Sequence, residues 1–202
     1  MQSKSQTTTT PSPIPVTADQ LAAWLAQEEQ VRNRMPADRA HRPADRSLSG
    51  LHTMQAMLRG ELAPPPIADT LDFLLLEVGP GTAVFQGRPL QRHYNPLGSV
   101  HGGWFATLLD SAMGCAVHTM MPPGRGYTTA ELSVNIVRAI TDKVPRVRAQ
   151  GRVIHCGRQL ATAEAQLVGA DGRLYAHGTT TCLVFELPTG NSEQGTVSPT
   201  RT

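Results

Sequence analysis

The chain has few charged residues and almost no net charge. Lys and Arg together number 18 among 202 residues, Asp and Glu number 16, and the net charge is +2 at pH 7. Binding to nucleic acid requires a clear excess of positive charge, at least on one face. The composition therefore gives no sign of a nucleic-acid partner, and only a local basic stripe would leave that possibility open.

Cysteine is scarce as well. Cys115, Cys156 and Cys182 lie far apart, show no CxxC spacing and fall within apolar or alternating runs. Disulfide frameworks and zinc sites use paired, closely spaced cysteines. We therefore expect buried free thiols in a reducing compartment, with neither a disulfide framework nor a metal site.

Long apolar runs are absent. No uninterrupted apolar run is long enough to cross a membrane, and residues 1–16 contain no apolar core of signal-peptide length. A cytoplasmic protein with no membrane partner is expected. Residues 1–16 and 188–202 are largely polar, and such segments bury too little apolar surface to offset the entropy of ordering. Both tails are predicted to be disordered.

The sequence does contain material for a globular core. Hydrophobic residues make up 40% of the chain, which suffices for one domain with extensions or for two small ones. Two amphipathic stretches come first: Leu21, Trp24, Leu25 and Val31 up to about Met35, then Leu48, Leu51, Met54 and Leu58 before Gly60 and Pro64 to Pro66. Residues 17–66 are predicted to form a helical extension, and residues 67–187 the main domain.

The main domain opens with short β-prone runs. The runs LDFLLLEV and TAVFQGRP are divided by a turn-forming Gly-Pro-Gly cluster at 79–81. Three later runs alternate with period two, and their expected core-facing residues are Leu132, Val134 and Ile136, then Val147, Ala149, Gly151 and Val153, then Ala161, Ala163, Ala165 and Leu167. The pair Asp171 and Gly172 gives a hairpin signal before a last strand over 174–185.

Between the first strands and the later ones lies a stretch with a different pattern. Residues 95–119 read NPLGSVHGGWFATLLDSAMGCAVHT. A polar entry opens into a segment that is apolar on nearly every side, which is the pattern of a helix buried all round. Together with the strands, this predicts an α+β fold in which an antiparallel sheet wraps around a central helix.

A single carboxylate, Asp110, lies within this helix. A buried carboxylate is costly unless something compensates its charge, and such residues are candidates for function. A purely structural explanation is also available, in which Ser111, Thr107 or a backbone donor holds the side chain.

The entry to the helix supplies a second candidate. Gly102 and Gly103 follow His101 at the point where loop becomes helix. Glycine lets a ligand approach the backbone there, and the first helical N–H groups lack internal partners. Such a site suits a carbonyl oxygen or a developing oxyanion. Alone, HGG is also consistent with an ordinary tight loop.

The spacing between the two candidates constrains how they can act. Asp110 follows Gly102 by eight residues, which is roughly 12 Å along a helix axis. Reacting groups must lie within about 3 to 3.5 Å of each other. One helix therefore cannot place both on one substrate, whereas two helices related by a two-fold axis can. We expect a dimer or tetramer with active sites between protomers.

Together these residues resemble a known family. Asn95, His101 with Gly102, and Asp110 within LLDSAMG are similar to the hotdog-fold acyl-CoA thioesterases of the PaaI-like type (phenylacetate-degradation and 4-hydroxybenzoyl-CoA thioesterases), over about residues 71–185. The resemblance implies a hotdog fold and the hydrolysis of a medium-chain or aromatic acyl-CoA to free acid and CoA. It implies self-association and no cofactor beyond the coenzyme A of the substrate.

The resemblance also implies roles for the residues of the helix. Asp110 matches the family's nucleophile or general base. Gly102 matches the residue whose backbone N–H polarises the thioester carbonyl, with Gly103 beside it on the substrate, and His101 matches the neighbour that shapes this loop.

Further roles fall outside the helix. Asn95 matches the polar side chain that orients the attacking water or the carboxylate. The family's hydroxyl residue falls at Thr129, or at Thr128 if the preceding loop is aligned one residue differently. Arginine forks suit the phosphates of coenzyme A. Arg138 and Arg146 are the arginines predicted to meet them, against the alternative that they belong to a solvated sheet face.

Two other functions stay open at this point. A hotdog dehydratase or enoyl-CoA hydratase would need a histidine and a carboxylate, which His101 and Asp110 formally supply. A non-catalytic acyl-CoA-binding module would keep the fold without turnover, because fold does not fix function. Release of free thiol from an acyl-CoA, set against the absorbance change of an enoyl-CoA, separates these activities.

Overall fold

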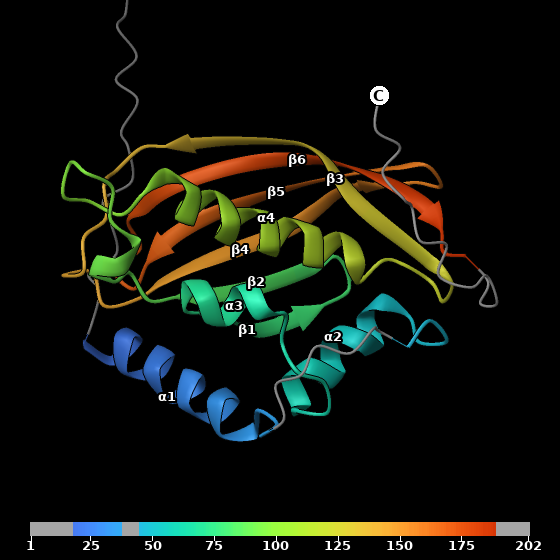
Figure 1. The fold of residues 1–202 in the computed structure, drawn as a ribbon, viewed down its shortest axis with the longest axis horizontal. Coiled ribbons are helices and arrows are strands. Elements are labelled where there is room, and N and C mark those ends of the chain that lie inside the picture. Colours follow the sequence, from blue (N-terminus) through green and yellow to red (C-terminus); the bar gives the residue numbers. More distant parts are fainter. Residues whose placement is uncertain (1–17, 38–44, 189–202) are drawn as a thin grey trace, which may run out of the picture.

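The computed structural model describes residues 18–37 and 45–188 (Figure 1). The predictions of disorder for residues 1–16 and from 189 onward lie outside the described residues. No helix among residues 18–37 and 45–188 is long and apolar enough to cross a membrane.

An antiparallel sheet forms the main layer of the molecule. Its six strands lie in the order β1-β2-β4-β5-β6-β3. Their bounds are β1 Phe73–Gly79, β2 Thr82–Gly87, β3 Arg125–Ile136, β4 Val147–Cys156, β5 Leu160–Gly169 and β6 Leu174–Glu186. Helix α4, Gly102–His118, lies along one face of this sheet (Figure 1). The predicted α+β fold, an antiparallel sheet curved around a central helix, is confirmed.

Three helices precede the sheet, namely α1 Ala18–Arg34, α2 Gly50–Arg59 and α3 Pro66–Leu71. Helix α2 ends where the sequence predicts, because Gly60 adopts φ of 78° and its N–H bonds to carbonyls of the last turn. Helix α3 is not among the elements that the sequence patterns predict, because it begins within a proline cluster. Pro66 is the first residue of α3, a position at which the missing N–H of proline costs nothing.

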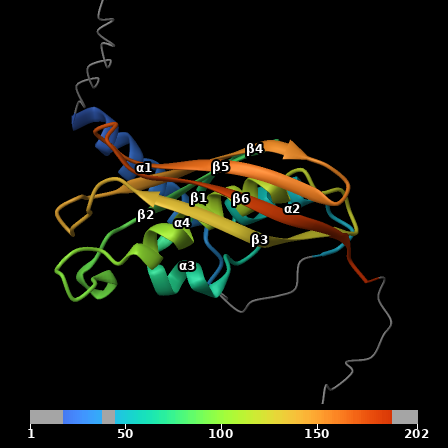
Figure 2. The same ribbon diagram turned by 90° about the horizontal axis from the view of Figure 1, so that it is seen from above.

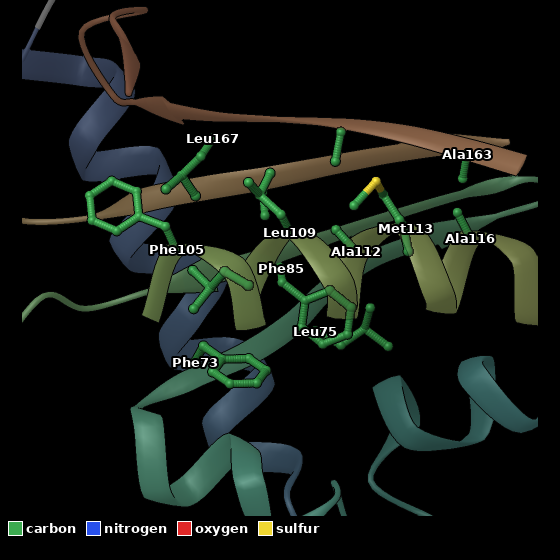
Figure 3. Packing of buried hydrophobic residues seen from close by; sticks show 14 of the residues in the cluster. Phe73, Leu75, Phe85, Phe105, Leu109, Ala112, Met113, Ala116, Ala163 and Leu167 are labelled. Carbon is green, nitrogen blue, oxygen red and sulfur yellow. The ribbon is translucent and has the colours of Figure 1, made fainter. Parts of the chain in front are cut away.

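The core lies between α4 and the inner face of the sheet. Leu109, Ala112 and Met113 are completely buried. Figure 3 shows Phe105 and Leu109 pointing toward Leu167 of β5. The predicted alanine row of β5 and the inward residues Val147 and Ala149 of β4 are fully or almost fully buried.

Small residues allow this close packing of helix on sheet. A Cβ added at Gly151 of β4 would lie 2.3 Å from the backbone oxygen of Ala112, which no real contact permits. Glycine is therefore required where α4 crosses β4.

The outer face of the sheet is not simply solvated. Figure 2 shows α1 on the other side of the sheet from α4. There Arg148 of β4 is only 6% exposed, with its guanidinium 4.4 Å from the ring centroid of Trp24 on α1. The alternative that Arg146 belongs to a solvated sheet face is therefore wrong, because α1 covers this part of the sheet and Glu28 of α1 pairs with Arg146.

The edge strand β3 is more exposed than the sequence predicts. Leu132 and Ile136, expected to face the core, are 37% and 46% exposed, and only Val134 of this set packs against it. The reason is position: β3 has a single neighbour, β6, so its free edge and part of its inner face stay uncovered in one chain.

Candidate active site

Helix α4 has one stripe that the core does not cover. Gly103 is exposed, and Thr107, Asp110, Ser111 and Cys115 are half-buried, whereas the remaining sides carry the buried residues of the helix. The expectation of a helix buried all round is therefore wrong for this stripe. Asp110 emerges from it, where a second molecule or a substrate can reach the carboxylate.

The Asp110 carboxylate has a specific partner. The Thr129 hydroxyl of β3 donates a hydrogen bond of 3.0 Å to Oδ1 of Asp110. The pairing of β3 with β6 shifts register between Thr129 and Glu131, a bulge of the kind that re-aims side chains. Neither Ser111 nor Thr107 holds the carboxylate, since Thr107 donates to the Gly103 oxygen instead. Thr128 is exposed, so Thr129 is the hydroxyl beside Asp110.

Neutral groups surround the carboxylate on the protein side. Burial raises the pKa of the Cys115 thiol to about 12, and the charge of Asp110 adds to this rise. Burial likewise raises the pKa of Tyr127 well above its usual value, with smaller contributions from Cys115, Cys182 and Asp110. Both groups stay protonated at neutral pH. Asp110 is thus the group in this cluster that can act as a base.

The N-terminus of α4 presents one unused backbone donor. His101 caps the helix, with its Nδ1 accepting a hydrogen bond of 2.9 Å from the Gly103 N–H. Gly102 is the first helical residue, and within residues 18–37 and 45–188 its N–H has no acceptor. Within the HGG sequence, the Gly103 N–H is bonded to the His101 side chain. The Gly102 N–H is therefore the backbone donor that a ligand can use.

Asn95 lies in the loop before this helix and closes that loop. Its Oδ1 accepts hydrogen bonds from the N–H of Leu97 at 2.8 Å and of Ser99 at 3.4 Å. Its Nδ2 donates to the Ser99 hydroxyl at 3.2 Å. The side chain is not bonded to Asp110. Leu97 at the tip of the loop is 91% exposed, an unusual position for a large apolar side chain.

Within one chain the predicted residues form two separate groups. Asp110 and Thr129 are together, and His101, Gly102 and Gly103 are together at the start of α4. Both groups are fixed to the same helix, eight residues apart, or roughly 12 Å. A single chain therefore does not bring Asp110 and the Gly102 N–H onto one atom.

The two predicted phosphate-binding arginines have different environments. Arg146 is paired with both carboxylate oxygens of Glu28 on α1. Arg138 is exposed and follows β3, with its backbone N–H bonded to the Tyr175 oxygen at 3.1 Å. The predicted pair is thus divided between a paired arginine and a solvent-facing one.

No metal centre is visible in the described part of the chain. Residues 18–37 and 45–188 hold no group of three or more His, Cys, Asp or Glu side chains able to bind a metal ion.

An apolar cavity that the sequence patterns do not indicate lies beside this helix. Ser111 and Cys115 of α4 face it, together with residues of α1, α2 and α3. Helical spacing relative to Asp110 could have placed Ser111 and Cys115 on a common face. The contribution of the extension could not be read from the sequence, because it depends on contacts between distant segments.

Part of the chain matches a known protein family. Residues 97–176 match a family model described as the thioesterase superfamily. None of the curated proteins compared with the chain matches it.

Solved structures share the fold. A phenylacetic acid degradation-related protein from Ralstonia eutropha is 27% identical, with 64% of this chain and 98% of that chain covered and a TM-score of 0.59. A variant of the phenylacetic acid degradation protein PaaI from Thermus thermophilus is also 27% identical, with coverage of 59% and 98% and a TM-score of 0.53. A thioesterase family protein from Silicibacter pomeroyi is 26% identical, with coverage of 60% and 90% and a TM-score of 0.56.

Proposed function

We propose that the protein is an acyl-CoA thioesterase, because residues 97–176 match the family model of the thioesterase superfamily. It cleaves a medium-chain or aromatic acyl-CoA to the free acid and coenzyme A. The observation that carries this proposal is the Asp110 carboxylate, held by Thr129 on the open stripe of α4. Partial burial of a carboxylate is energetically unfavourable, so such a residue is a candidate for a functional role.

Asp110 supplies the attack on the thioester. As a general base it takes a proton from water, whose oxygen bonds to the carbonyl carbon; as a nucleophile it forms an anhydride that water then opens. In both routes the C–S bond breaks and the CoA sulfur leaves as thiolate and gains a proton. The Thr129 hydroxyl donates to one carboxylate oxygen and so leaves the other free to react.

The Gly102 N–H stabilises the charge that develops on the carbonyl oxygen. It is a fixed backbone donor at a helix N-terminus, where the helix dipole also favours negative charge. Losing one such donor typically costs about 10² to 10³ in rate. Asn95, in the loop before α4, is the side chain proposed to orient the water, with its Nδ2 bonded to Ser99.

The active site forms between two protomers. Gly102 and Asp110 lie too far apart along α4 to act on one substrate within a chain, and a two-fold axis between antiparallel helices removes that difficulty. Apolar side chains left exposed on the loop before α4 and on the edge strand β3, Leu97, Leu132 and Ile136, support a partner on this side.

The coenzyme A part of the bound substrate would extend from the site past the end of β3. A cleft of about 360 Å³ is lined by Lys143, Arg146, Arg173 and Tyr175, and Arg138 adjoins it through its bond to Tyr175. This cleft lies at the same end as the entrance of α4, because Val100 bonds to Ile140 between the two. Arg138, exposed and free of Glu28, is the better candidate for a phosphate.

A thiol-release assay tests the proposal. Purified protein should liberate free CoA from one or more acyl-CoA substrates, and Asp110→Asn should lower that rate while circular dichroism and the oligomeric state stay unchanged. Thiol release by the Asp110→Asn protein at the wild-type rate would overturn the assignment. Hydration of an enoyl-CoA without thiol release would favour a hydratase instead.

A further inference from the structure

The N-terminal extension and the thioesterase domain enclose an apolar cavity between them. Its volume is about 100 Å³. From the extension come Val31 and Met35 of the α1 region and Met54 and Met57 of α2; from α4 come Ser111 and Cys115. The remaining lining is aliphatic, aromatic or proline, so the cavity presents no charged side chain.

The cavity lies next to the proposed reactive carboxylate. Ser111 and Cys115 follow Asp110 by one and five positions on the same helix. At about 100° per residue, Ser111 lies about 100° and Cys115 about 140° around α4 from Asp110, so the cavity borders the flank of the helix beside Asp110 and the carboxylate does not line it. The opposite wall is formed by Phe73, Leu75 and Phe85 of the β1–β2 hairpin. Figure 3 shows these three side chains below α4.

We propose that this cavity receives the acyl group of the substrate and that the extension, through Met35, Met54 and Met57, sets the size of the acyl group accepted. The inference rests on the proposed function, because it takes the acyl-CoA as given. It narrows the range proposed above from medium-chain or aromatic acyl groups to compact, uncharged ones, single-ring or short-chain. Straight chains as long as octanoyl and acyl groups with a terminal carboxylate are rejected.

The size and the apolar lining of the cavity support this substrate class. An apolar cavity of roughly 150 Å³ is known to admit benzene, so a cavity of about 100 Å³ admits a few carbon atoms as it stands. Methionine is flexible and fills irregular space, so the three methionines can move to admit one ring. A terminal carboxylate would be buried there without a partner, which strongly disfavours its binding.

Two variants change the cavity in opposite directions. Ala68 lies in the wall at α3 and is 3% exposed, so Ala68→Leu places a larger side chain in the cavity. Met57 is only half-buried, so Met57→Ala enlarges the cavity at a small cost in stability. Met121→Ala is the matched control, since Met121 is 2% exposed in the core and does not line the cavity.

The experiment measures kcat/KM by thiol release for acetyl-, butyryl-, phenylacetyl-, octanoyl- and succinyl-CoA. One methylene in an apolar pocket changes kcat/KM by about 10-fold or more. Ala68→Leu should therefore lower kcat/KM for butyryl- and phenylacetyl-CoA by about tenfold while acetyl-CoA changes little. Met57→Ala should raise the octanoyl to butyryl ratio by about tenfold. Met121→Ala should leave all ratios unchanged.

A binding measurement separates the two proposals. Calorimetry with Asp110→Asn protein reports the affinity for each acyl-CoA without turnover. Wild-type hydrolysis with ratios that neither cavity variant alters would overturn the cavity assignment alone. Affinities that follow the cavity variants, with no thiol released by the wild type, would support the cavity and overturn the hydrolase.

Discussion

The Thr129 hydroxyl lies 3.0 Å from Oδ1 of Asp110 and donates a hydrogen bond to it. The two residues come from different elements, a bulged edge strand and the central helix, and they meet on the stripe of α4 that the core leaves open. The contact fixes the rotamer of the carboxylate. It also satisfies one of its oxygens in a site otherwise lined by neutral groups.

Replacing either residue should affect rate more than stability. Asp110→Asn removes the base or nucleophile, and kcat should fall by about 10² to 10⁴. Thr129→Val removes one hydrogen bond to a charged group and should lower kcat by about tenfold. Thr129→Ser keeps the hydroxyl and is the matched control, expected near the wild-type rate. Equal activity of the Val and Ser proteins would show that the hydrogen bond has no catalytic role.

The backbone donor at the start of α4 can be removed without breaking the helix. Gly102 occupies the first helical position, where proline is tolerated and lacks the N–H. Gly102→Pro should lower kcat by about 10² to 10³. Gly102→Ala keeps the N–H and places a Cβ 3.2 Å from Ile136 Cδ1, so it controls for the added bulk. Equal loss in both variants would assign the effect to crowding.

The same variant tests whether the site is shared between protomers. In a mixed dimer of Asp110→Asn and Gly102→Pro chains, one site combines the intact Asp110 of one chain with the intact Gly102 of its partner. Mixing the two inactive proteins under conditions of subunit exchange should therefore restore activity, up to about a quarter of wild type for random pairing across a two-fold axis. No recovery despite proven exchange would place each site within one chain.

Glu28 anchors α1 to the outer face of the sheet. Burial favours the neutral carboxyl, but hydrogen bonds from Arg146, Arg32 and Gln86 outweigh it, and the pKa of Glu28 is lowered from 4.5. A lowered pKa in the folded state means that this stabilisation is complete above about pH 4.5 and is lost as pH falls through the folded value.

Glu28→Gln should therefore destabilise the protein at pH 7 by roughly 1–3 kcal/mol, and the difference from wild type should shrink below about pH 4.5. Urea unfolding at several pH values measures it. Glu29→Gln, an exposed neighbour on the same helix, is the control and should change stability little. A Glu28→Gln difference independent of pH would contradict the ion-pair explanation.

Crowding between α4 and β4 gives a stability prediction. Gly151→Ala should cost about 1–3 kcal/mol, because its Cβ would lie 2.3 Å from the Ala112 oxygen and backbone must shift. Gly79→Ala is the matched control, since its nearest neighbour is only the Thr82 side chain. The urea midpoint should move for Gly151→Ala with an unchanged slope. Equal shifts in both proteins would refute the close-packing explanation.

Local patterns were enough to predict most of the fold. Alternation placed Val147, Ala149 and the alanines of β5 in the core, and the glycine at 60 ended α2 as expected. Patterns failed where a residue's surroundings come from a distant segment. The alternation of β4 places Arg148 on the outer face, where a strand pattern alone predicts exposure. The contact with Trp24 of α1 buries it instead.

The candidate site divides in the same way. Asp110 stood out because a carboxylate in an apolar helix violates the local pattern, and the structure supplies Thr129 as the donor that compensates it. The exposure of Leu132 and Ile136 could not be anticipated, because strand alternation identifies a face and not what covers it. The cavity was hidden for a related reason, since its walls come from residues 31–115.

Helix α1 serves two surfaces with residues less than one turn apart. Glu28 pairs with Arg146 at the outer face of the sheet, and Val31 lines the cavity beside α4. If the cavity receives the acyl group as proposed, substitutions in the extension would change which acyl group is admitted while Asp110, Thr129 and Gly102 stay the same. Part of the wall that selects the substrate would then lie outside the catalytic helix and could vary separately from it.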